Sequence, residues 1–572
     1  MLDQATQSAY DARRDLAGKP FRAGCYAPWS SLYFNTNGDV VACCKNTRYV
    51  FGNVARERLD DIWRGPRVKA LRAAMQKYAF GLGCEFCEWQ IRGKQWSGLH
   101  AARYEDLPLP PAADEVGWPS SMEFAMSNTC NLACIMCYGV LSSTIRAHRE
   151  KLPPLPRVYD DVFFADLAKY LPHLREARFV GGEPFLMPES YRVWDLMIEQ
   201  GLSTPCHVTT NGTQWGAKVE RVLEALPISI SVSMDGVSKA TVESIRQNAD
   251  FDTVRQNVLR FADYVRRRGT SISMSFCLMQ QNWREFGAYL EFAEGLGAPV
   301  YVHTVIHPDR SSLFTLPAKR LQAVIDELER EQDRYVVLPR NGHVYREALE
   351  SLRVHLREQG ARSVDAVKRS ASDLRLNEGN DPLERAAAMI EKGRHDDALA
   401  LVEPVLATPM DKVADKSAHY LALTLRGRAL RLTGRDGAEA ALDAAIALWP
   451  KAPNAFVERA WLRLNAERVP EALADARAAV AAIGDDRAHV LAPDAFDVFG
   501  LASAAAGDAA TAVTAMDELV QLRPNAADTF VHRAWVLVRA GRVDEARSSL
   551  DEALDLAPDS AEALQLRASL SG

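Results

Sequence analysis

Three of the ten cysteines of this chain lie within eight residues, in the stretch SNTCNLACIMCYG from 127 to 139. Cys130, Cys134 and Cys137 have the spacing C-x3-C-x2-C, and clustered cysteines in a thiol-reducing compartment bind metal or do chemistry more often than they form disulfides. A structural zinc site and a fully ligated 4Fe–4S cluster each need four protein ligands. Three cysteines would leave one iron of a cluster open to another ligand. A chance triplet within a partial zinc knuckle is the alternative.

A second motif, GGEP, follows the cysteine triplet by about 45 residues, and together the two resemble the radical SAM superfamily. The resemblance implies that the open iron chelates the amino and carboxylate groups of S-adenosylmethionine (SAM). It also places four residues in the SAM site: Gly181, Gly182, Glu183 and Pro184. The glycines would bring backbone close to the SAM amino group, and Glu183 would help to hold it. Met136 replaces the aromatic residue common before the third cysteine and would still cover the cluster with a polarisable apolar group.

Six strand-like segments recur between residues 120 and 310, separated by helical segments: MEFAMS, ARFVGG, PCHVTTNG, PISISVSMDG, SISMSFCLM and PVYVHTVIHP. Strands that alternate with helices predict a parallel sheet with right-handed crossovers. In β/α barrels the chemistry gathers at the C-terminal ends of the strands, where the cysteine triplet and GGEP fall. The chain is therefore predicted to be an α/β protein, and it fits the partial (β/α)6 barrel that the resemblance implies, over residues 118–325.

Two of the predicted strands alternate polar and apolar residues, whereas buried parallel strands usually run as continuous apolar stretches. The fourth strand puts four polar residues on one face: Ser229, Ser231, Ser233 and Asp235. The fifth strand does the same: Ser271, Ser273, Ser275 and Cys277. A polar face on strands that helices cover predicts a polar lumen, because buried polar groups need partners. Poorly covered strands with solvated serines are the alternative.

The resemblance to the radical SAM superfamily assigns further SAM contacts at the ends of the third and fourth strands. Ser233 and Asp235, in SVSMDG, would contact the ribose, and Asn211 would join the SAM-binding residues. Arg246, in VESIR, would pair with the SAM carboxylate, for which a planar guanidinium is well suited. A solvated arginine on a helix is the alternative for Arg246.

Five more cysteines lie in the first ninety residues, around a hairpin that turns at Asn37-Gly38. A hairpin followed by a distal C-x2-C resembles the twitch or SPASM modules of radical SAM enzymes, which bind auxiliary 4Fe–4S clusters, and the likeness covers residues 20–95. The resemblance implies one cluster with four ligands: Cys25, Cys43, Cys84 and Cys87. Cys43 is preferred over Cys44 by its spacing from Gly38. Such modules usually follow the barrel, whereas this one precedes it. A zinc ribbon is the alternative.

The last 190 residues contain no cysteine and are rich in alanine, and they repeat themselves. Gly507 and Gly541 stand 34 residues apart, and so do Pro524 and Pro558. Residues 382–572 resemble an all-α array of tetratricopeptide repeats, preceded by a helical bridge or linker over 326–381. The concave surface of such arrays holds peptides or protein segments. A dimerisation or scaffold role is the alternative.

Composition and charge do not point to nucleic acid or a membrane as partner. The chain has 572 residues, 48% of them hydrophobic and 25% charged, with a net charge of −7. This mild charge gives no electrostatic reason to expect nucleic acid or an anionic membrane as partner. The N-terminal residues show no signal peptide, and no run of eighteen apolar residues suggests a membrane span. The predicted location is the cytoplasm.

Taken together, the motifs predict a radical SAM enzyme with a SAM-binding 4Fe–4S cluster and one auxiliary 4Fe–4S cluster. The resemblance implies that a ferredoxin- or flavodoxin-type reductant supplies an electron, and that SAM is cleaved to methionine and a 5′-deoxyadenosyl radical that abstracts a substrate hydrogen. A peptide or protein-carried substrate, held by the repeats, is the first hypothesis. A sugar, nucleotide or other small molecule is the second. A non-catalytic zinc-binding repeat scaffold is a third hypothesis, of a different class.

Overall fold

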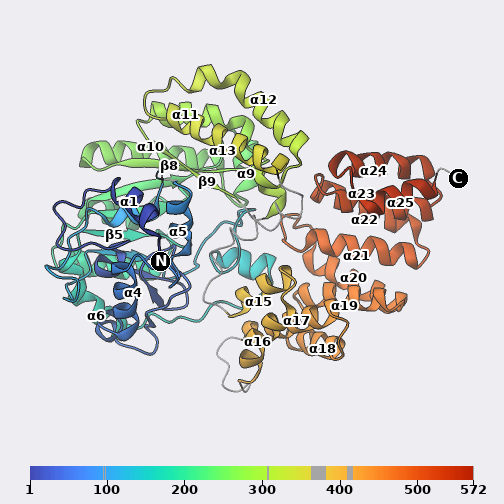
Figure 1. The fold of residues 1–572 in the computed structure, drawn as a ribbon, viewed down its shortest axis with the longest axis horizontal. Helices are drawn as coiled ribbons and strands as arrows, with labels where there is room; N and C mark the ends of the chain where they lie inside the picture. Colours follow the sequence, from blue (N-terminus) through green and yellow to red (C-terminus); the bar gives the residue numbers. More distant parts are fainter. Residues whose placement is uncertain (95, 97, 306–307, 362–381, 409–415, 571–572) are drawn as a thin grey trace.

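The computed structural model describes residues 1–570 except 95, 97, 306–307, 362–381 and 409–415. Figure 1 shows two bodies, a sheet covered by helices on the left and a curved stack of helices on the right. The predicted bridge over 326–381 falls partly outside the described residues. Among the residues described, no helix combines the length and the apolarity needed to cross a membrane.

One nine-stranded sheet organises the first body, in the order β3-β2-β1-β4-β5-β6-β7-β8-β9. Every pair from β1–β4 to β8–β9 is parallel, whereas β1–β2 and β2–β3 are antiparallel. The six predicted strands are β4 to β9 in the predicted order, which confirms the α/β class. The strands are Ser31–Phe34, Asp39–Val41, Gly52–Asn53, Ser121–Phe124, Glu176–Phe179, Cys206–Thr210, Ile228–Ser233, Ile272–Leu278 and Val300–Thr304.

The predicted hairpin is formed by β1 and β2 and is continuous with the barrel. Gly38 turns the chain with a φ of 83°, a left-handed conformation that favours glycine. Tyr33 of β1 lies opposite Glu123 of β4 in a parallel pair, so the hairpin adds strands to the edge of the barrel sheet. The N-terminal module and the barrel therefore share one sheet, although they are separate in sequence. The module's α-helices are α1 (Gln4–Asp11), α2 (Ala27–Ser30), α3 (Leu59–Trp63), α4 (Pro66–Gln76) and α5 (Glu85–Arg92).

Helices cross between the parallel strands and cover the outer face of the barrel. The longest of these crossing helices, α10 (Phe251–Arg268), shows the local reasons for its bounds. Asp250 caps its first turn by accepting from Thr253 N at 2.8 Å, and Gly269 ends it in the left-handed conformation at φ 69°. Its apolar stripe packs into the barrel core. The other barrel helices include α6 (Asp161–Tyr170), α7 (Pro188–Glu199), α8 (Ala217–Ala225), α9 (Lys239–Ile245) and α11 (Phe286–Gly295).

The polar faces of β7 and β8 are half-buried and bonded to each other. Along β7 the isoleucines and valine are buried and the serines between them are only half-buried. Ser231 Oγ lies 3.2 Å from Ser275 Oγ, and Ser271 Oγ donates to Ser229 Oγ at 3.1 Å. The alternation seen in the sequence thus separates a face packed against helices from a polar face on which the hydroxyls pair across strands.

Two helices after the last strand, α12 (Ala318–Tyr335) and α13 (Gly342–Ala361), belong to the barrel core. Leu321, Ile325 and Leu328 of α12 are buried in the same hydrophobic cluster as the sheet. The Tyr345 side chain of α13 is fully buried there, and its hydroxyl donates to Leu328 O at 2.8 Å. Since α12 begins before residue 325, the end proposed for the barrel domain falls inside a helix.

The second body is an all-α array in which successive helix pairs pack against one another. Small residues allow the close approach of helices: a side chain at Gly427 would collide with Leu442, and one at Gly500 with Met516. The array is the predicted repeat region. Its helices are α15 (Pro382–Glu391), α16 (His395–Leu406), α17 (Lys416–Leu432), α18 (Ala438–Leu448), α19 (Asn454–Asn465), α20 (Val469–Ile483), α21 (Ala492–Ala505), α22 (Ala509–Leu522), α23 (Ala527–Arg539), α24 (Val543–Leu556) and α25 (Ala561–Ser569).

Candidate metal centres and active site

The cysteine triplet lies on the loop that follows β4. Ala133 N donates to Gln247 O at 3.0 Å and Ile135 N donates to Ile245 O at 2.9 Å, so the loop is paired with the end of α9 and the residues just after it. Cys130 N donates to Ser143 Oγ at 3.1 Å. We call residues 130–137 the cluster loop. Hydrogen bonds hold the backbone of the cluster loop on two sides, so the cysteine sulfur atoms are the groups of this loop that could bind a metal.

The thiols of the triplet lie in one another's electrostatic field. Burial is the main cause that raises the pKa of Cys130 to about 11 and that of Cys137 to about 12, and the neighbouring Cys134 adds to both shifts. Burial also raises the pKa of the Cys134 thiol, although the nearby guanidinium groups of Arg246 and Arg149 oppose the shift. Thiols in such a place ionise only when a cation binds them. The donor set therefore fits a metal cluster with three cysteine ligands.

The GGEP loop after β5 packs directly against the backbone that leads to Cys130. Gly181 has a φ of 103°, which favours glycine. A side chain at Gly182 would collide with the carbonyl oxygen of Thr129 and lie 2.8 Å from the carbonyl carbon of Asn128. Glu183 N donates to Thr129 O at 2.8 Å. The two glycines thus make a close backbone approach beside the cluster loop, which fits the predicted SAM cradle.

Glu183 is fully buried beside Pro184, and its carboxylate accepts three hydrogen bonds from the protein. The donors are Phe185 N at 3.1 Å, Thr210 Oγ1 at 2.8 Å and Asn211 N at 2.7 Å. Burial raises the pKa of Glu183 to about 7, and these donors oppose the shift. The side chain ties the loop after β5 to the loop after β6.

Asn211 is brought to the cluster loop from the end of β6. Its Nδ2 donates to Asn131 Oδ1 at 3.0 Å and lies 3.8 Å from Cys130 Sγ. Asn211 is buried, and Thr213 N donates to its Oδ1 at 2.9 Å. The structure therefore joins the third predicted strand end to the cysteine triplet.

Asp235 and Arg246 form a buried ion pair beside the cluster loop. Asp235 Oδ2 lies 2.7 Å from Arg246 Nη2, and Asp235 Oδ1 accepts from Cys277 N at 2.7 Å. Arg246 Nη1 is 4.0 Å from Cys134 Sγ. Ser233 stands half-buried at the end of β7. The structure thus pairs Asp235 and Arg246 with each other, and their contacts with SAM remain predictions.

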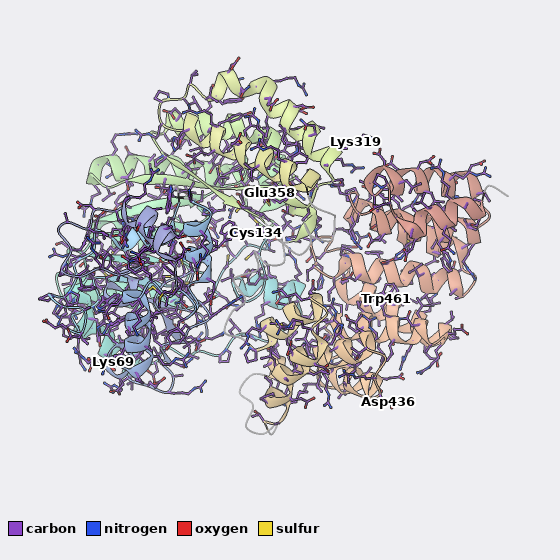
Figure 2. The ribbon with its side chains drawn as sticks, in the orientation of Figure 1. Lys69, Cys134, Lys319, Glu358, Asp436 and Trp461 are labelled. Carbon is purple, nitrogen blue, oxygen red and sulfur yellow. The ribbon has the colours of Figure 1, made fainter. Side chains whose placement is uncertain are left out.

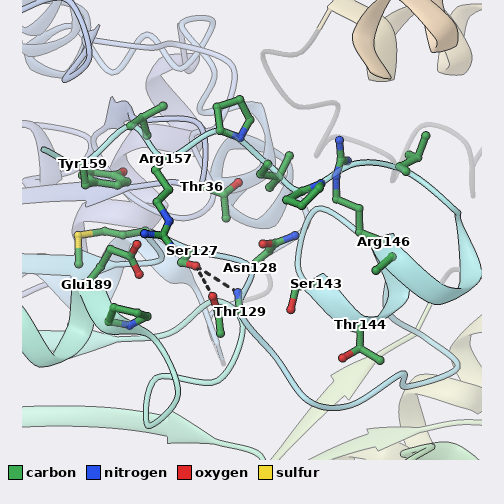
Figure 3. A pocket seen from close by; sticks show the side chains of 18 of the residues that line it. Thr36, Ser127, Asn128, Thr129, Ser143, Thr144, Arg146, Arg157, Tyr159 and Glu189 are labelled. Carbon is green, nitrogen blue, oxygen red and sulfur yellow. Dashed lines mark hydrogen bonds between the residues drawn. The ribbon is translucent and has the colours of Figure 1, made fainter. Parts of the chain in front are cut away.

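A cavity of about 410 Å³ lies beside residues 127–129, which lead into the cluster loop. Figure 3 shows Ser127, Thr129 and Ser143 lining it beside Arg146. Ser127 Oγ and Thr129 Oγ1 are 2.8 Å apart, so these two hydroxyl groups of the cavity wall hydrogen-bond to each other.

The four predicted auxiliary ligands surround one small cavity of about 20 Å³. Burial raises the pKa of all four thiols, that of Cys25 to about 12, and neighbouring cysteines add to the shift at three of them. Cys84 precedes α5 and Cys87 lies in its first turn, so the C-x2-C spacing puts both on one side of a helix start. The four cysteines that line this shared cavity provide the donor set of a fully ligated cluster.

Cys44 is the fifth cysteine of the module and is not among the residues that line this cavity. Its sulfur lies 3.7 Å from His100 Nε2, whose pKa burial lowers to about 3, so the ring is neutral. Asn46 Nδ2 donates to Cys84 Sγ at 3.1 Å on the cavity side. The placement favours Cys43 over Cys44 as the ligand.

The neighbouring cysteines allow a matched test. We expect Cys43→Ala to remove about half of the iron bound after anaerobic reconstitution, because one of four ligands is lost. Cys44→Ala should leave the iron content unchanged. Iron analysis and the visible absorption of the two variants provide the measurement. Equal iron in both, or loss only in Cys44→Ala, would contradict the assignment.

Sequence reasoning missed the residues that brace the cluster loop from outside. Arg149, Gln247 and Asp486 meet behind it, and Asp486 comes from the repeat array. No spacing or motif links positions so far apart. Cys277 was noticed only as part of an alternating strand, and the structure places its amide on Asp235.

A three-cysteine loop after a strand end and a separate four-cysteine cavity provide the donor sets of an iron–sulfur protein of the α/β class. The model of the radical SAM superfamily matches residues 124–293, so this part of the chain is a radical SAM domain. A SPASM iron–sulfur cluster-binding domain matches residues 25–88. Tetratricopeptide repeat models match residues 428–487 and 503–570.

The sequence identity to individual known proteins is low. A GTP 3′,8-cyclase of Chlorobaculum tepidum is 28% identical over 138 residues, which are 23% of this chain and 38% of the cyclase. The match thus spans well under half of that relative. Among solved structures, a thermophilic TPR protein of Thermus thermophilus is 21% identical and covers 33% of this chain and 95% of its own, with a TM-score of 0.27. YrrB, a TPR protein with an unusual peptide-binding site, is 18% identical over 36% of this chain and 96% of its own, at 0.26.

Proposed function

We propose that this chain cleaves SAM reductively and uses the resulting radical to abstract a hydrogen atom from a peptide or protein-carried substrate. The observation that carries the proposal is the cluster loop: Cys130, Cys134 and Cys137 at the end of the first barrel strand, with Gly181 and Gly182 packed against its backbone. No fourth cysteine belongs to the motif, as an iron that must also bind SAM requires.

In this proposal the three cysteines hold a 4Fe–4S cluster and the GGEP backbone receives the SAM amino group. When bound, the cluster supplies the electron that cleaves SAM. Asn211 and Ser233 stand at the neighbouring strand ends, where they would position the rest of the SAM molecule. Arg246 would direct one edge of its guanidinium group toward the SAM carboxylate and would remain paired with Asp235.

Cys25, Cys43, Cys84 and Cys87 would hold the auxiliary cluster. With four protein ligands this cluster would transfer electrons and would not bind substrate. An external ferredoxin- or flavodoxin-type protein is the proposed reductant. The proposed location is the cytoplasm, whose reducing environment keeps all seven predicted ligand cysteines available.

Repeats of the tetratricopeptide class supply the support for a peptide substrate, because such arrays bind extended segments. Neighbouring helices of this array are linked by charged pairs that could recognise polar backbone and side chains. Arg431 contacts Glu458 at 2.7 Å, and His532 Nδ1 lies 2.8 Å from Asp497 Oδ1. A nucleotide or other small molecule is the second candidate, favoured by the likeness to a GTP cyclase.

The test measures 5′-deoxyadenosine formed by the full, reconstituted chain under reducing, anaerobic conditions. We expect a short peptide encoded beside the gene to raise this rate by about tenfold or more over the substrate-free rate, because remote binding energy assists the reacting centre. GTP should leave the rate unchanged. Stimulation by GTP and not by the peptide would favour the small-molecule candidate. Zinc in place of iron in the isolated protein would favour the non-catalytic scaffold.

A further inference from the structure

The repeat array contacts the barrel along one edge. We call this the docking edge, and it consists mainly of residues between successive helix pairs: Ser417, Trp449, Asp486, Ala488, Pro524 and Asn525. Figure 2 shows Cys134 near the middle of the molecule, between the sheet and the repeats. The docking edge of the array therefore faces the part of the barrel that carries the predicted SAM site.

On the barrel side, the contacts come from loops at the C-terminal ends of the strands. The π-helix η2 (Ile145–Arg149) and the residues after it supply one group, and the loops after β8 and β9 supply the others. Apolar packing joins the polar contacts, since Leu152 is buried in a cluster with Tyr420 and Leu442. The polar pairs include Arg146–Ser417, Lys151–Trp449, Gln280–Asn525 and Arg310–Ala488.

Arg149 connects the docking edge to the cluster loop through a single guanidinium group. Its Nη2 donates to Ala133 O at 2.8 Å and to Gln247 Oε1 at 2.8 Å, and its Nη1 donates to Cys134 O at 3.2 Å. Its Nε donates to Asp486 Oδ2 of the array, also at 2.8 Å. The Arg149 side chain is 5% exposed. A buried cation with this many partners holds its neighbours in one arrangement.

The same loop is held from its other side by the segment 245–247, at the end of α9. The amides of Ala133 and Ile135 donate to carbonyls of that segment, whereas the carbonyls of Ala133 and Cys134 accept from Arg149. The backbone that carries Cys134 therefore lies between two supports, one of which depends on the array.

We infer that Arg149 is a positioning residue for the SAM-cluster loop, and that Asp486 of the repeat array completes it by fixing the place of the guanidinium and balancing its charge. The repeat array is then part of the cluster's surroundings as well as a binding surface. The inference rests on the proposed function for the identity of the cluster, and on the observed contacts for the brace itself.

The first test follows hydrogen exchange in the full chain. Asp486→Asn keeps the side-chain oxygen that accepts from Ala488 N but places an NH2 group against Arg149. We expect the amides of Ala133 and Ile135 to exchange about tenfold faster or more, because a charge-assisted hydrogen bond to a buried group is lost. Asp555→Asn is the matched control, since it removes the carboxylate charge from the exposed Lys319–Asp555 contact between the same two bodies.

Exchange is measured on the iron-free and on the reconstituted chain, which separates the inference from the proposed function. A wild-type chain that takes up no iron would refute the proposed clusters, yet the exchange comparison would still decide on the brace. Exchange in Asp486→Asn that matches that in Asp555→Asn would overturn the inference. Unchanged exchange in β7 shows that the variant has not loosened as a whole.

The second test uses the reduction potential of the SAM cluster, followed by electron paramagnetic resonance in the reconstituted chain. Removing the Asp486 carboxylate leaves the Arg149 charge unbalanced, so Asp486→Asn should shift the potential to a less negative value. Arg149→Gln removes the positive charge and should shift it the opposite way. A general loosening of the structure would shift the reduction potential of both variants in the same direction. Shifts of the same sign, or no shift in either, would overturn the charge role.

Discussion

Replacing Cys130, Cys134 and Cys137 together by alanine should remove about half of the reconstituted iron and all SAM cleavage. Each of the two proposed 4Fe–4S clusters would contribute about four irons, and the variant would lose the ligands of one. Cleavage should stop because, in the proposed function, SAM binds the open iron of that cluster and receives its electron. Iron analysis and 5′-deoxyadenosine formation measure the two losses.

Cys206→Ala is the matched control for the triplet. Cys206 is fully buried at the start of β6, away from both cysteine sets, and should keep full iron and SAM cleavage. SAM cleavage that persists in the triple variant at more than a trace would refute the assignment of the cluster loop.

Replacing Cys84 and Cys87 by alanine should remove the other half of the iron and reduce product formation more than substrate-independent SAM cleavage. The auxiliary cavity and the cluster loop are lined by separate sets of cysteines, so the SAM cluster keeps all of its ligands. Measuring product and 5′-deoxyadenosine in the same reaction shows whether product formation falls more than SAM cleavage. Cys44→Ala provides the control, because it alters the same module outside the cavity.

Equal loss of product and of SAM cleavage, in a variant that remains folded, would show that the module also builds the SAM site. The structure offers a route for such coupling. β1 pairs with β4, from whose end the cluster loop starts, and Tyr159 donates to the hairpin carbonyl of Asn35. Thermal unfolding of the iron-free variants separates loss of the cluster from damage to the shared sheet.

The docking edge changes how the role of the repeats can be tested. Removing residues 382–572 would take away Asp486 and expose Leu152, so it disturbs the cluster loop as well as any substrate-binding surface. A fall in turnover after such a truncation would not distinguish the two roles. Substitutions of single residues on the array, with Asp555→Asn as a reference, keep the roles apart.

Much of the chemistry could be predicted because it depends on local spacing. A metal cluster needs cysteines a few residues apart, so C-x3-C-x2-C and the distal C-x2-C carry their meaning in the sequence. Helical repeats contact mainly their neighbours, which makes a period of 34 residues visible without a structure. Alternation along a strand assigns faces, and the serines of β7 lie as the pattern indicated. The family and the fold were confirmed on these grounds.

What remained undetermined depends on contacts between distant residues. Cys43 and Cys44 differ by only one position in their spacing to every motif, and the packing of the module places Cys43 at the cavity and Cys44 beside His100. Arg246 could have faced solvent or SAM, and the fold buries it against Asp235. Arg149 and Asp486 are 337 positions apart, so no periodicity or motif could have joined them. Local spacing determined which chemistry this chain can hold, and tertiary packing decided which groups surround that chemistry, because burial and charge pairing arise only when the chain has folded.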